Sequence, residues 1–132
     1  MTRIPHAEMV DVFSRALEAR SVAADRAHKI AVILTDSTCD GVPSHGLHRF
    51  PGIVEDIETG RIVPSADAEC VGSFGALEQW DARQGPGVLT ATTAMARAVE
   101  IAQVSTMGCV ALRNANHWMR AATYGLQAAA AG

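Results

Sequence analysis

The hydrophobic pattern of the first part of the chain is helical. Over residues 6–20, apolar side chains recur every three or four positions with charged side chains between them, which predicts an amphipathic helix. Ser21 is suited to cap a second helix, because its hydroxyl can accept a backbone N–H, and this helix is predicted to end near Asp36. The two helices are predicted to form a helical hairpin. The apolar face of the second helix consists of Ala27, Ile30, Ala31 and Leu34.

A cluster of turn formers at residues 36–43 separates this hairpin from a third helical segment. Ser44 is positioned to cap that segment, which is predicted to reach about Glu58. Pro51 either kinks it or begins a separate helix, where its missing N–H costs nothing. Gly60 is the predicted end.

In the second half of the chain, the pattern alternates short strands with helices. Residues 62–80 predict extended segments with a turn near Gly75, and the apolar run at residues 109–113 predicts a strand. The helix-breaking residues 85–87 precede a predicted long helix, and a last, alanine-rich helix is predicted over residues 118–131. The predicted class is a layered α/β (α+β) fold. Residues 1–132 are expected to form a single unit, helical over 1–60 and mixed over 61–132.

Composition limits the class of protein. With 48% hydrophobic and 19% charged residues, the chain is expected to be globular rather than disordered. A net charge of -3 without a basic stripe argues against nucleic acid as a partner. The sequence has no signal peptide pattern and no membrane-length apolar run, so a cytoplasmic location without a membrane partner is expected. The three cysteines, widely spaced and odd in number, are expected to be reduced and buried.

The stretch SHGLHRF, residues 44–50, is the first candidate for chemistry. On a helix, His45 and Arg49 would share one face. The guanidinium can bind a carboxylate through two N–H groups while the imidazole exchanges a proton at the adjacent carbon. A 2-oxo or 2-hydroxy acid has that layout. Ser44 fits as a cap, and Gly46 would let a ligand approach the backbone closely.

Two other interpretations of this stretch remain open. On residue types alone, surface histidines with Arg49 paired to Glu55 or Asp56 are favoured. A metal site is weaker, because no spacing here matches a known ligand template. Its ligands would be Cys39, Asp40, His45 and His48.

The loop at residues 114–117, with the sequence NANH, is the second candidate. It follows a predicted strand and precedes a predicted helix, a position that ligands favour because helix N-termini present free N–H groups. The alternative is a turn in which Asn116 caps the helix and His117 is exposed.

Gly85 and Gly87 are expected to form a plain turn rather than a phosphate cradle. Core or interface positions are expected for Trp80, Trp118 and Tyr124.

Three motifs resemble the malate/L-lactate dehydrogenase family, whose members lack a Rossmann domain. GVPSHGLHRFP, residues 41–51, resembles the SHGxxR signature of that family. GALEQWDA at 75–82 and LRNANHWMRAATYGLQAA at 112–129 resemble its 2,3-diketo-L-gulonate reductase branch. The resemblance runs from the N-terminal helices to the last residue. Because members continue well past this length, the chain is expected to be an N-terminal portion that lacks the remaining cofactor-binding part.

The resemblance implies a homodimeric oxidoreductase that transfers a hydride between NAD, or NADP, and a 2-oxo acid, with 2,3-diketo-L-gulonate as one candidate. It makes His45 and His117 the catalytic residues and leaves open which of them donates the proton. Substrate binding is implied for Ser44, Arg49 and Asn116. No cofactor-binding residue is assigned, no metal is expected, and His48 has no role because its position in the motif varies. The alternatives are a non-catalytic truncated remnant and a small metal-binding module.

Overall fold

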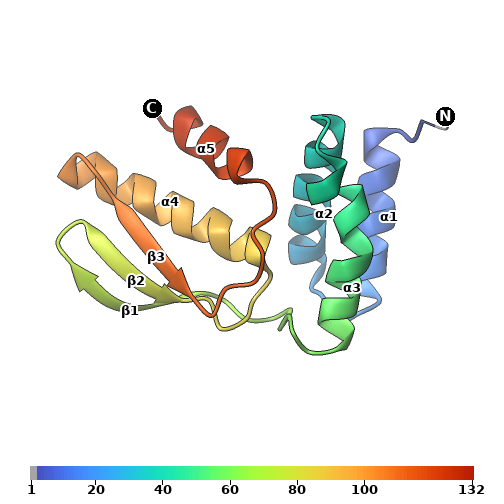
Figure 1. Ribbon diagram of the computed structural model, residues 1–132, viewed down its shortest axis with the longest axis horizontal. Coiled ribbons are helices and arrows are strands. Elements are labelled where there is room, and N and C mark those ends of the chain that lie inside the picture. Colours follow the sequence, from blue (N-terminus) through green and yellow to red (C-terminus); the bar gives the residue numbers. More distant parts are fainter. Residues whose placement is uncertain (1–2) are drawn as a thin grey trace. The chain divides into compact units, whose positions relative to one another are not determined.

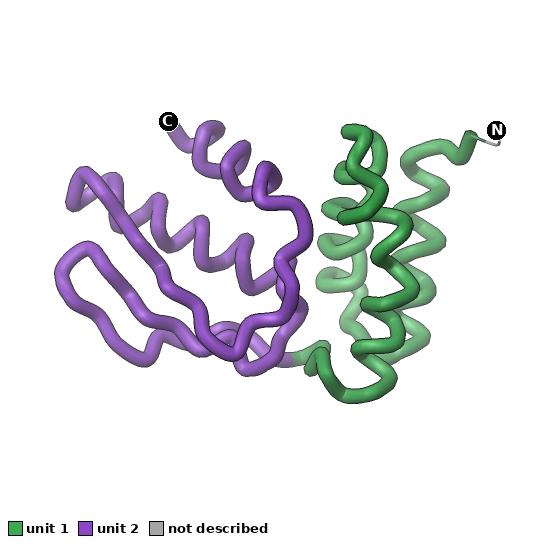
Figure 2. Tube along the Cα trace, in the orientation of Figure 1, with its two compact units in different colours: residues 1–65 green, residues 66–132 purple. Residues whose placement is uncertain are grey.

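The computed structural model describes residues 3–132, which fall into two compact units. The first unit is Met1–Ser65 and the second is Ala66–Gly132, drawn in green and purple in Figure 2. The first unit is helical, and the second combines a sheet with helices, as Figure 1 shows. The predicted α/β (α+β) class, with a helical first part, is therefore confirmed. That residues 1–132 act as a single unit stays a prediction.

The first unit is built on the predicted hairpin, α1 (His6–Glu18) and α2 (Ala24–Cys39). Its core lies between the two helices and continues to α3 (Phe50–Glu58), since the ring of Phe13 stacks on that of Phe50 with centroids 3.9 Å apart. The apolar face predicted for the second helix is fully buried. Burying such a face is the main source of helix stability in a folded protein.

The boundaries of α2 differ from the prediction. Ser21 does not cap this helix, because the residue at the N-cap is Ala23 and no side chain bonds there. Ser21 instead lies in the connecting turn with a φ of 63°. At the other end the helix continues through the predicted turn formers to Cys39. The hydroxyls of Ser37 and Thr38 each donate to the carbonyl four residues earlier, at 2.9 Å, so these residues stay helical.

The third helical segment is divided into three pieces. Two 3₁₀ turns, η1 (Pro43–His45) and η2 (Leu47–Arg49), precede α3. Ser44 lies inside the first 3₁₀ turn, so the prediction that it caps a long helix is wrong. Pro51 lies in the first turn of α3, which confirms the separate-helix alternative. The chain leaves α3 through Gly60, as predicted, with a φ of 75°.

The second unit contains a three-stranded sheet in the order β1-β2-β3. The strands β1 (Glu69–Phe74) and β2 (Leu77–Asp81) are antiparallel and joined by a turn at Gly75. The strand β3 (Cys109–Arg113) runs parallel to β2, and α4 (Gly87–Ser105) is the crossover between them. These elements confirm the predicted strands, turn and long helix. In Figure 1, α4 lies between the sheet and α5 (Ala121–Ala130).

The last helix begins later than predicted. Residues 118–120 are not helical, and Met119, with a φ of 65°, turns the chain before α5 starts at Ala121.

The cysteines also differ from the prediction. No disulfide joins Cys39, Cys70 and Cys109, but all three are exposed rather than buried. Cys39 ends α2, and the other two lie on the outer strands of the sheet, where few atoms cover them. Within residues 3–132, no helix is long and apolar enough to cross a membrane.

An ion pair between a buried carboxylate and a half-buried guanidinium joins the sheet to α4. Glu78 of β2 is 8% exposed and accepts three hydrogen bonds of 2.7–3.1 Å from the guanidinium of Arg97. The indole of Trp80 donates to the same carboxylate at 2.8 Å. These bonds, first from Arg97 and then from Trp80, lower the pKa of Glu78.

Replacing Glu78 with glutamine is expected to destabilise the protein at neutral pH and to weaken its loss of stability in acid. Because the folded-state pKa lies below the unfolded one, the stabilisation is present above the unfolded pKa and disappears as the pH falls through the folded pKa. Thermal unfolding of both proteins over a series of pH values measures this. Glu100→Gln is the matched control, since Glu100 also binds Arg97 but is 63% exposed and is expected to matter little. Equal acid sensitivity of wild type and Glu78→Gln would contradict the expectation.

Candidate functional site

The SHG segment lies against α2 and is fixed there by Thr38. The Thr38 hydroxyl accepts the backbone N–H of Leu47 at 2.8 Å and donates to the carbonyl of Leu34. Gly46 is buried, and a Cβ at that position would lie 2.5 Å from the Leu34 carbonyl oxygen. The close approach of the two backbones therefore requires glycine.

His45 and Arg49 do not share a helical face. The backbone of Gly46, with a φ of -131° and a ψ of -115°, lies outside the helical region and separates the two 3₁₀ turns. A spacing of four residues aligns side chains only along a continuous helix. The prediction of a shared face is wrong for this reason, although both residues remain within one short segment of the first unit.

His45 is half-buried and paired with the preceding residue. Its Nδ1 lies 3.0 Å from the hydroxyl oxygen of Ser44. A hydroxyl can turn to donate or to accept, so this contact is compatible with both the neutral imidazole and the imidazolium.

Arg49 forms an ion pair with Asp56 that leaves some of its N–H donors unused. A guanidinium Nη2 of Arg49 lies 3.7 Å from Asp56 Oδ2, which is the pairing that the surface interpretation anticipated. Asp56 also accepts a shorter bond, of 2.7 Å, from the Nε of Arg61. Among the described residues, nothing accepts a hydrogen bond from the buried Nε of Arg49, and its side chain is 42% exposed. Since a guanidinium carries five donors, Arg49 retains the capacity to bind a further anion.

The residues of the alternative metal site do not form one. Within residues 3–132, no group of three or more histidine, cysteine, aspartate or glutamate side chains is arranged to hold a metal ion. Cys39 ends α2, whereas His45 and His48 lie on separate 3₁₀ turns that Gly46 divides.

The NANH loop of the second unit is tied to the turn that follows β2. The carboxylate of Asp81 accepts the backbone N–H of Arg83 at 2.9 Å, the side-chain amide of Asn114 at 2.9 Å and the Nε of Arg113 at 3.0 Å. These bonds, chiefly those from Arg83 and Asn114, lower the pKa of Asp81. Asp81 is therefore the anionic anchor of the loop.

Asn116 fastens the same loop to the turn before α4. Its Nδ2 lies 2.8 Å from the carbonyl oxygen of Gln84 and 3.1 Å from that of Gly85. The interpretation of Asn116 as a helix cap is wrong, because α5 starts only at Ala121 and the residue at its N-cap is Arg120. The chain turns at Met119 first, which displaces the helix start.

The first turn of α4 packs directly on the backbone of this loop. A Cβ at Gly87 would lie 2.5 Å from the carbonyl oxygen of Asn116 and would overlap that of His117. The start of α4 therefore faces carbonyl oxygens of the chain itself, which repel a phosphate rather than bind it. This agrees with the plain turn predicted for Gly85 and Gly87.

The imidazole of His117 is oriented by the chain that follows it. Its Nδ1 accepts the backbone N–H of Met119 at 2.8 Å. The His117 residue is exposed, whereas Met119 is buried and only 6% exposed. The left-handed backbone of Met119 turns its N–H back toward the ring.

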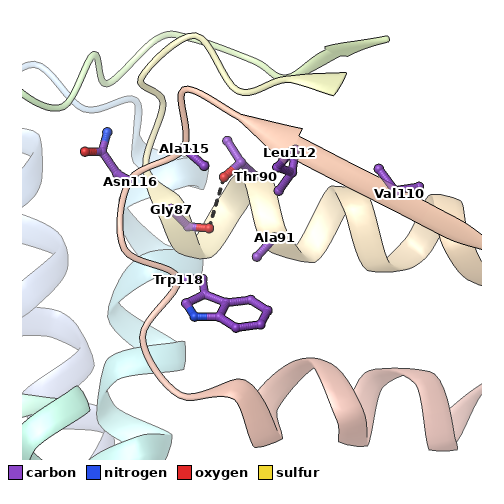
Figure 3. Close-up of a pocket in the computed structure, with 8 residues that line it drawn as sticks. All are labelled: Gly87, Thr90, Ala91, Val110, Leu112, Ala115, Asn116 and Trp118. Atoms are coloured by element: carbon purple, nitrogen blue, oxygen red, sulfur yellow. Dashed lines mark hydrogen bonds between the residues drawn. The ribbon is translucent and has the colours of Figure 1, made fainter. Parts of the chain in front are cut away.

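A cavity of about 320 Å³ lies beside the NANH loop. Figure 3 shows that its lining comes from the start of α4, from β3 and from the loop. The indole of Trp118 forms one wall, is 51% exposed and stacks on Tyr124 with centroids 5.6 Å apart. Tyr124 is buried, as predicted, and donates its hydroxyl to the Trp118 carbonyl. The lining residues are Gly87, Thr90, Ala91, Val110, Leu112, Ala115, Asn116 and Trp118.

Four residues that organise these two segments were not candidates from the sequence. Asp81 lies inside the GALEQWDA motif and Gly87 inside the breaker, so a signal existed for both, although it did not reveal what they contact. Asp56 was named only as a neighbour of Arg49. Thr38 was part of the predicted turn cluster, but the sequence does not indicate its bond to Leu47, because the proximity of the two residues depends on the 3₁₀ turns.

The chain is similar to known dehydrogenases over nearly its whole length. The family model described as malate/L-lactate dehydrogenase matches residues 4–132. The 2,3-diketo-L-gulonate reductase of Salmonella newport (strain SL254) is 45% identical over 130 residues, which are 98% of this chain and 39% of that protein. The chain thus spans well under half the length of this relative.

Solved structures of two dehydrogenases share the fold of this chain. The malate dehydrogenase of Pyrococcus horikoshii OT3 superposes with a TM-score of 0.91 at 25% identity, over 96% of this chain and 36% of that one. The sulfolactate dehydrogenase of Methanocaldococcus jannaschii superposes with a TM-score of 0.89 at 28% identity, over 94% of this chain and 36% of that one.

Proposed function

Because this chain belongs to the malate/L-lactate dehydrogenase family, we propose that the protein that carries it reduces a 2-oxo acid with NADH or NADPH and oxidises the 2-hydroxy acid in the reverse direction. The diketogulonate reductase at 45% identity supports 2,3-diketo-L-gulonate, or an acid of similar shape, as the substrate. Since the chain spans 39% of that relative, the proposed activity is that of the whole protein.

The observation that carries the proposal is the arrangement of the SHG segment. Arg49 has guanidinium donors that Asp56 does not use, and a 2-oxo acid offers a carboxylate to accept them. We assign Arg49 to that carboxylate. Ser44 forms a hydrogen bond with His45 and is proposed to line the substrate pocket together with Arg49.

His45 is proposed to donate the proton to the carbonyl oxygen as the carbonyl carbon is reduced. Reduction places negative charge on that oxygen, and an imidazolium neutralises it, which typically accelerates such steps about 10²- to 10⁴-fold. The bond from the imidazolium nitrogen to hydrogen breaks and an O–H bond forms, leaving His45 neutral. The contact with the Ser44 hydroxyl persists through this change.

We assign none of the described residues to the nicotinamide cofactor. The one glycine-flanked helix start within residues 3–132, at Gly87, is filled by carbonyl oxygens of the NANH loop. We therefore propose that other parts of the whole protein supply most of the cofactor contacts.

Asn116 is proposed to contribute to substrate binding by holding its loop. Its amide nitrogen already faces the carbonyl oxygens of Gln84 and Gly85, so the loop is expected to move if the amide is lost.

The family resemblance further supports a cytoplasmic homodimer without nucleic acid or membrane partners. Light scattering of the purified whole protein tests the dimer.

Replacing Arg49 with alanine in the whole protein is expected to raise KM for 2-oxo acids about 10- to 100-fold, the cost of losing a hydrogen bond to a charged group. Arg49→Lys should recover only part of this, because an ammonium cannot reproduce the bidentate fork. The measurement follows cofactor oxidation with a series of 2-oxo acids and with matched ketones that lack the carboxylate.

The ketones supply the control. If Arg49 binds the carboxylate, its loss leaves their already poor turnover unchanged. An equal loss on acids and ketones would remove the assignment of Arg49. If the wild-type protein turns over no 2-oxo acid and shows no saturable binding of NADH, the non-catalytic alternative is correct.

A further inference from the structure

One carboxylate lies between two arginines at the end of the SHG segment. Asp56 is largely buried, with 19% of its side chain exposed. Its Oδ1 accepts a hydrogen bond of 2.7 Å from the Nε of Arg61, whereas its Oδ2 lies 3.7 Å from the Nη2 of Arg49. Arg61 is therefore hydrogen-bonded to Asp56, and Arg49 is held only by the weaker attraction of a longer ion pair.

The end of α3 places Arg61 at this carboxylate. The helix ends at Glu58, and Gly60 turns the chain with a φ of 75°. The backbone N–H of Ile62 then donates to the carbonyl of Asp56 at 2.9 Å, and the Ile62 side chain is buried. This turn brings Arg61 back beside the last turn of the helix. The hydrogen bond to Asp56 is the main reason that the pKa of Arg61 is raised.

The guanidinium of Arg49 lies along the same helix. A Cβ at Gly52 would lie 3.1 Å from the Nη1 of Arg49, so the absence of a side chain at Gly52 leaves room for the guanidinium there. Asp56 follows Gly52 by four residues and therefore lies one turn further along this face of α3. A small side-chain movement would close the gap of 3.7 Å and join Arg49 to Asp56 through two parallel hydrogen bonds.

We propose that Arg61 sets the affinity of the site for acid substrates by occupying Asp56, which leaves the donors of Arg49 for the substrate carboxylate. The inference rests on the proposed reductase function. Asp56 and a substrate carboxylate are the same chemical group, and they compete for one guanidinium. While Arg61 neutralises Asp56, the substrate is favoured in this competition. Arg61 acts only through Asp56 and Arg49, so it is a positioning residue.

Replacing Arg61 with alanine in the whole protein should raise KM for 2-oxo acids about 3- to 5-fold, the effect of a partly exposed ion pair, with kcat unchanged. Without Arg61, Asp56 binds Arg49 more closely, and the substrate has to displace it. Matched ketones that lack the carboxylate should show no change in KM. Arg61→Lys should stay close to the wild type, because an ammonium also occupies Asp56.

Two double variants with equal net charge separate competition at Asp56 from a general loss of positive charge. Arg61→Ala with Asp56→Asn removes the competing carboxylate, so KM should return to the wild-type value. Arg61→Ala with Glu55→Gln removes one negative charge from the neighbouring residue, whose carboxylate lies 3.5 Å from Arg61, and KM should stay raised. Recovery in both double variants, or in neither, would overturn the proposal.

A crystal structure of the whole Arg61→Ala protein tests the same competition without turnover. We expect Asp56 to lie at hydrogen-bonding distance from the Arg49 guanidinium, about 2.7–3.2 Å, rather than at 3.7 Å. A wild-type protein that reduces no 2-oxo acid would overturn the proposed function, and with it the role of Arg61, even if this distance shortens. An active wild type whose Arg61→Ala variant keeps either the distance or KM unchanged would overturn the inference alone.

Discussion

Replacing His45 with alanine in the whole protein is expected to lower kcat for 2-oxo acids by about 10²- to 10⁴-fold, with a much smaller change in KM. The imidazole is proposed to act only when negative charge develops on the carbonyl oxygen, so its loss affects the transition state rather than substrate binding. Steady-state kinetics with saturating cofactor give both constants.

The neighbouring His48→Ala variant is the matched control. His48 is exposed, lies three residues further on in the second 3₁₀ turn and has no proposed role, so its kinetics should equal those of the wild type. Added imidazole should restore part of the activity of His45→Ala, because the space left by the ring can admit a free acid. Loss of activity in both variants, or no loss in His45→Ala, would remove the assignment of His45.

Replacing Gly87 with alanine is expected to destabilise the protein by about 1–3 kcal/mol, the usual range for overpacking. The added methyl group would lie 2.5 Å from the carbonyl oxygen of Asn116, and backbone rather than a flexible side chain must move to relieve it. Urea unfolding measures the loss. The same shift should disturb the bond between Met119 and His117, which NMR spectra of the histidine ring would detect.

Gly125→Ala is the control for this change. Gly125 lies in the interior of α5, and a Cβ there would meet nothing within 4 Å among the described residues. Alanine should therefore stabilise the protein by about 0.5–1 kcal/mol through its higher helix propensity. If both substitutions change the free energy of unfolding in the same direction, the close packing of α4 on the NANH loop is not what constrains Gly87.

The regular elements of this chain follow from its sequence, because each depends on residues close together in the chain. The strand at Cys109–Arg113, the turn at Gly75 and the helix after Gly87 all have local signals. The errors arise where a polar side chain has two local options. Ser21 was a plausible cap but lies in a turn, and Thr38 was a plausible turn former but bonds back into its own helix.

The candidate residues could be named from the sequence, but their geometry could not. Periodicity treats residues 44–58 as one helix, whereas the packing of Gly46 on α2 divides that segment and separates His45 from Arg49. Likewise, the sequence does not indicate that the backbone N–H of Met119 points at the His117 ring, because a left-handed backbone at a methionine has no signal in residue type.

The most direct test of the central claim is a crystal structure of the whole protein with its cofactor and oxamate, an unreactive analogue of a 2-oxo acid. The account predicts that the oxamate carboxylate accepts two hydrogen bonds from the Arg49 guanidinium and that the imidazole of His45 faces the neighbouring oxygen. Oxamate bound away from both residues, with Arg49 still directed at Asp56, would contradict the account.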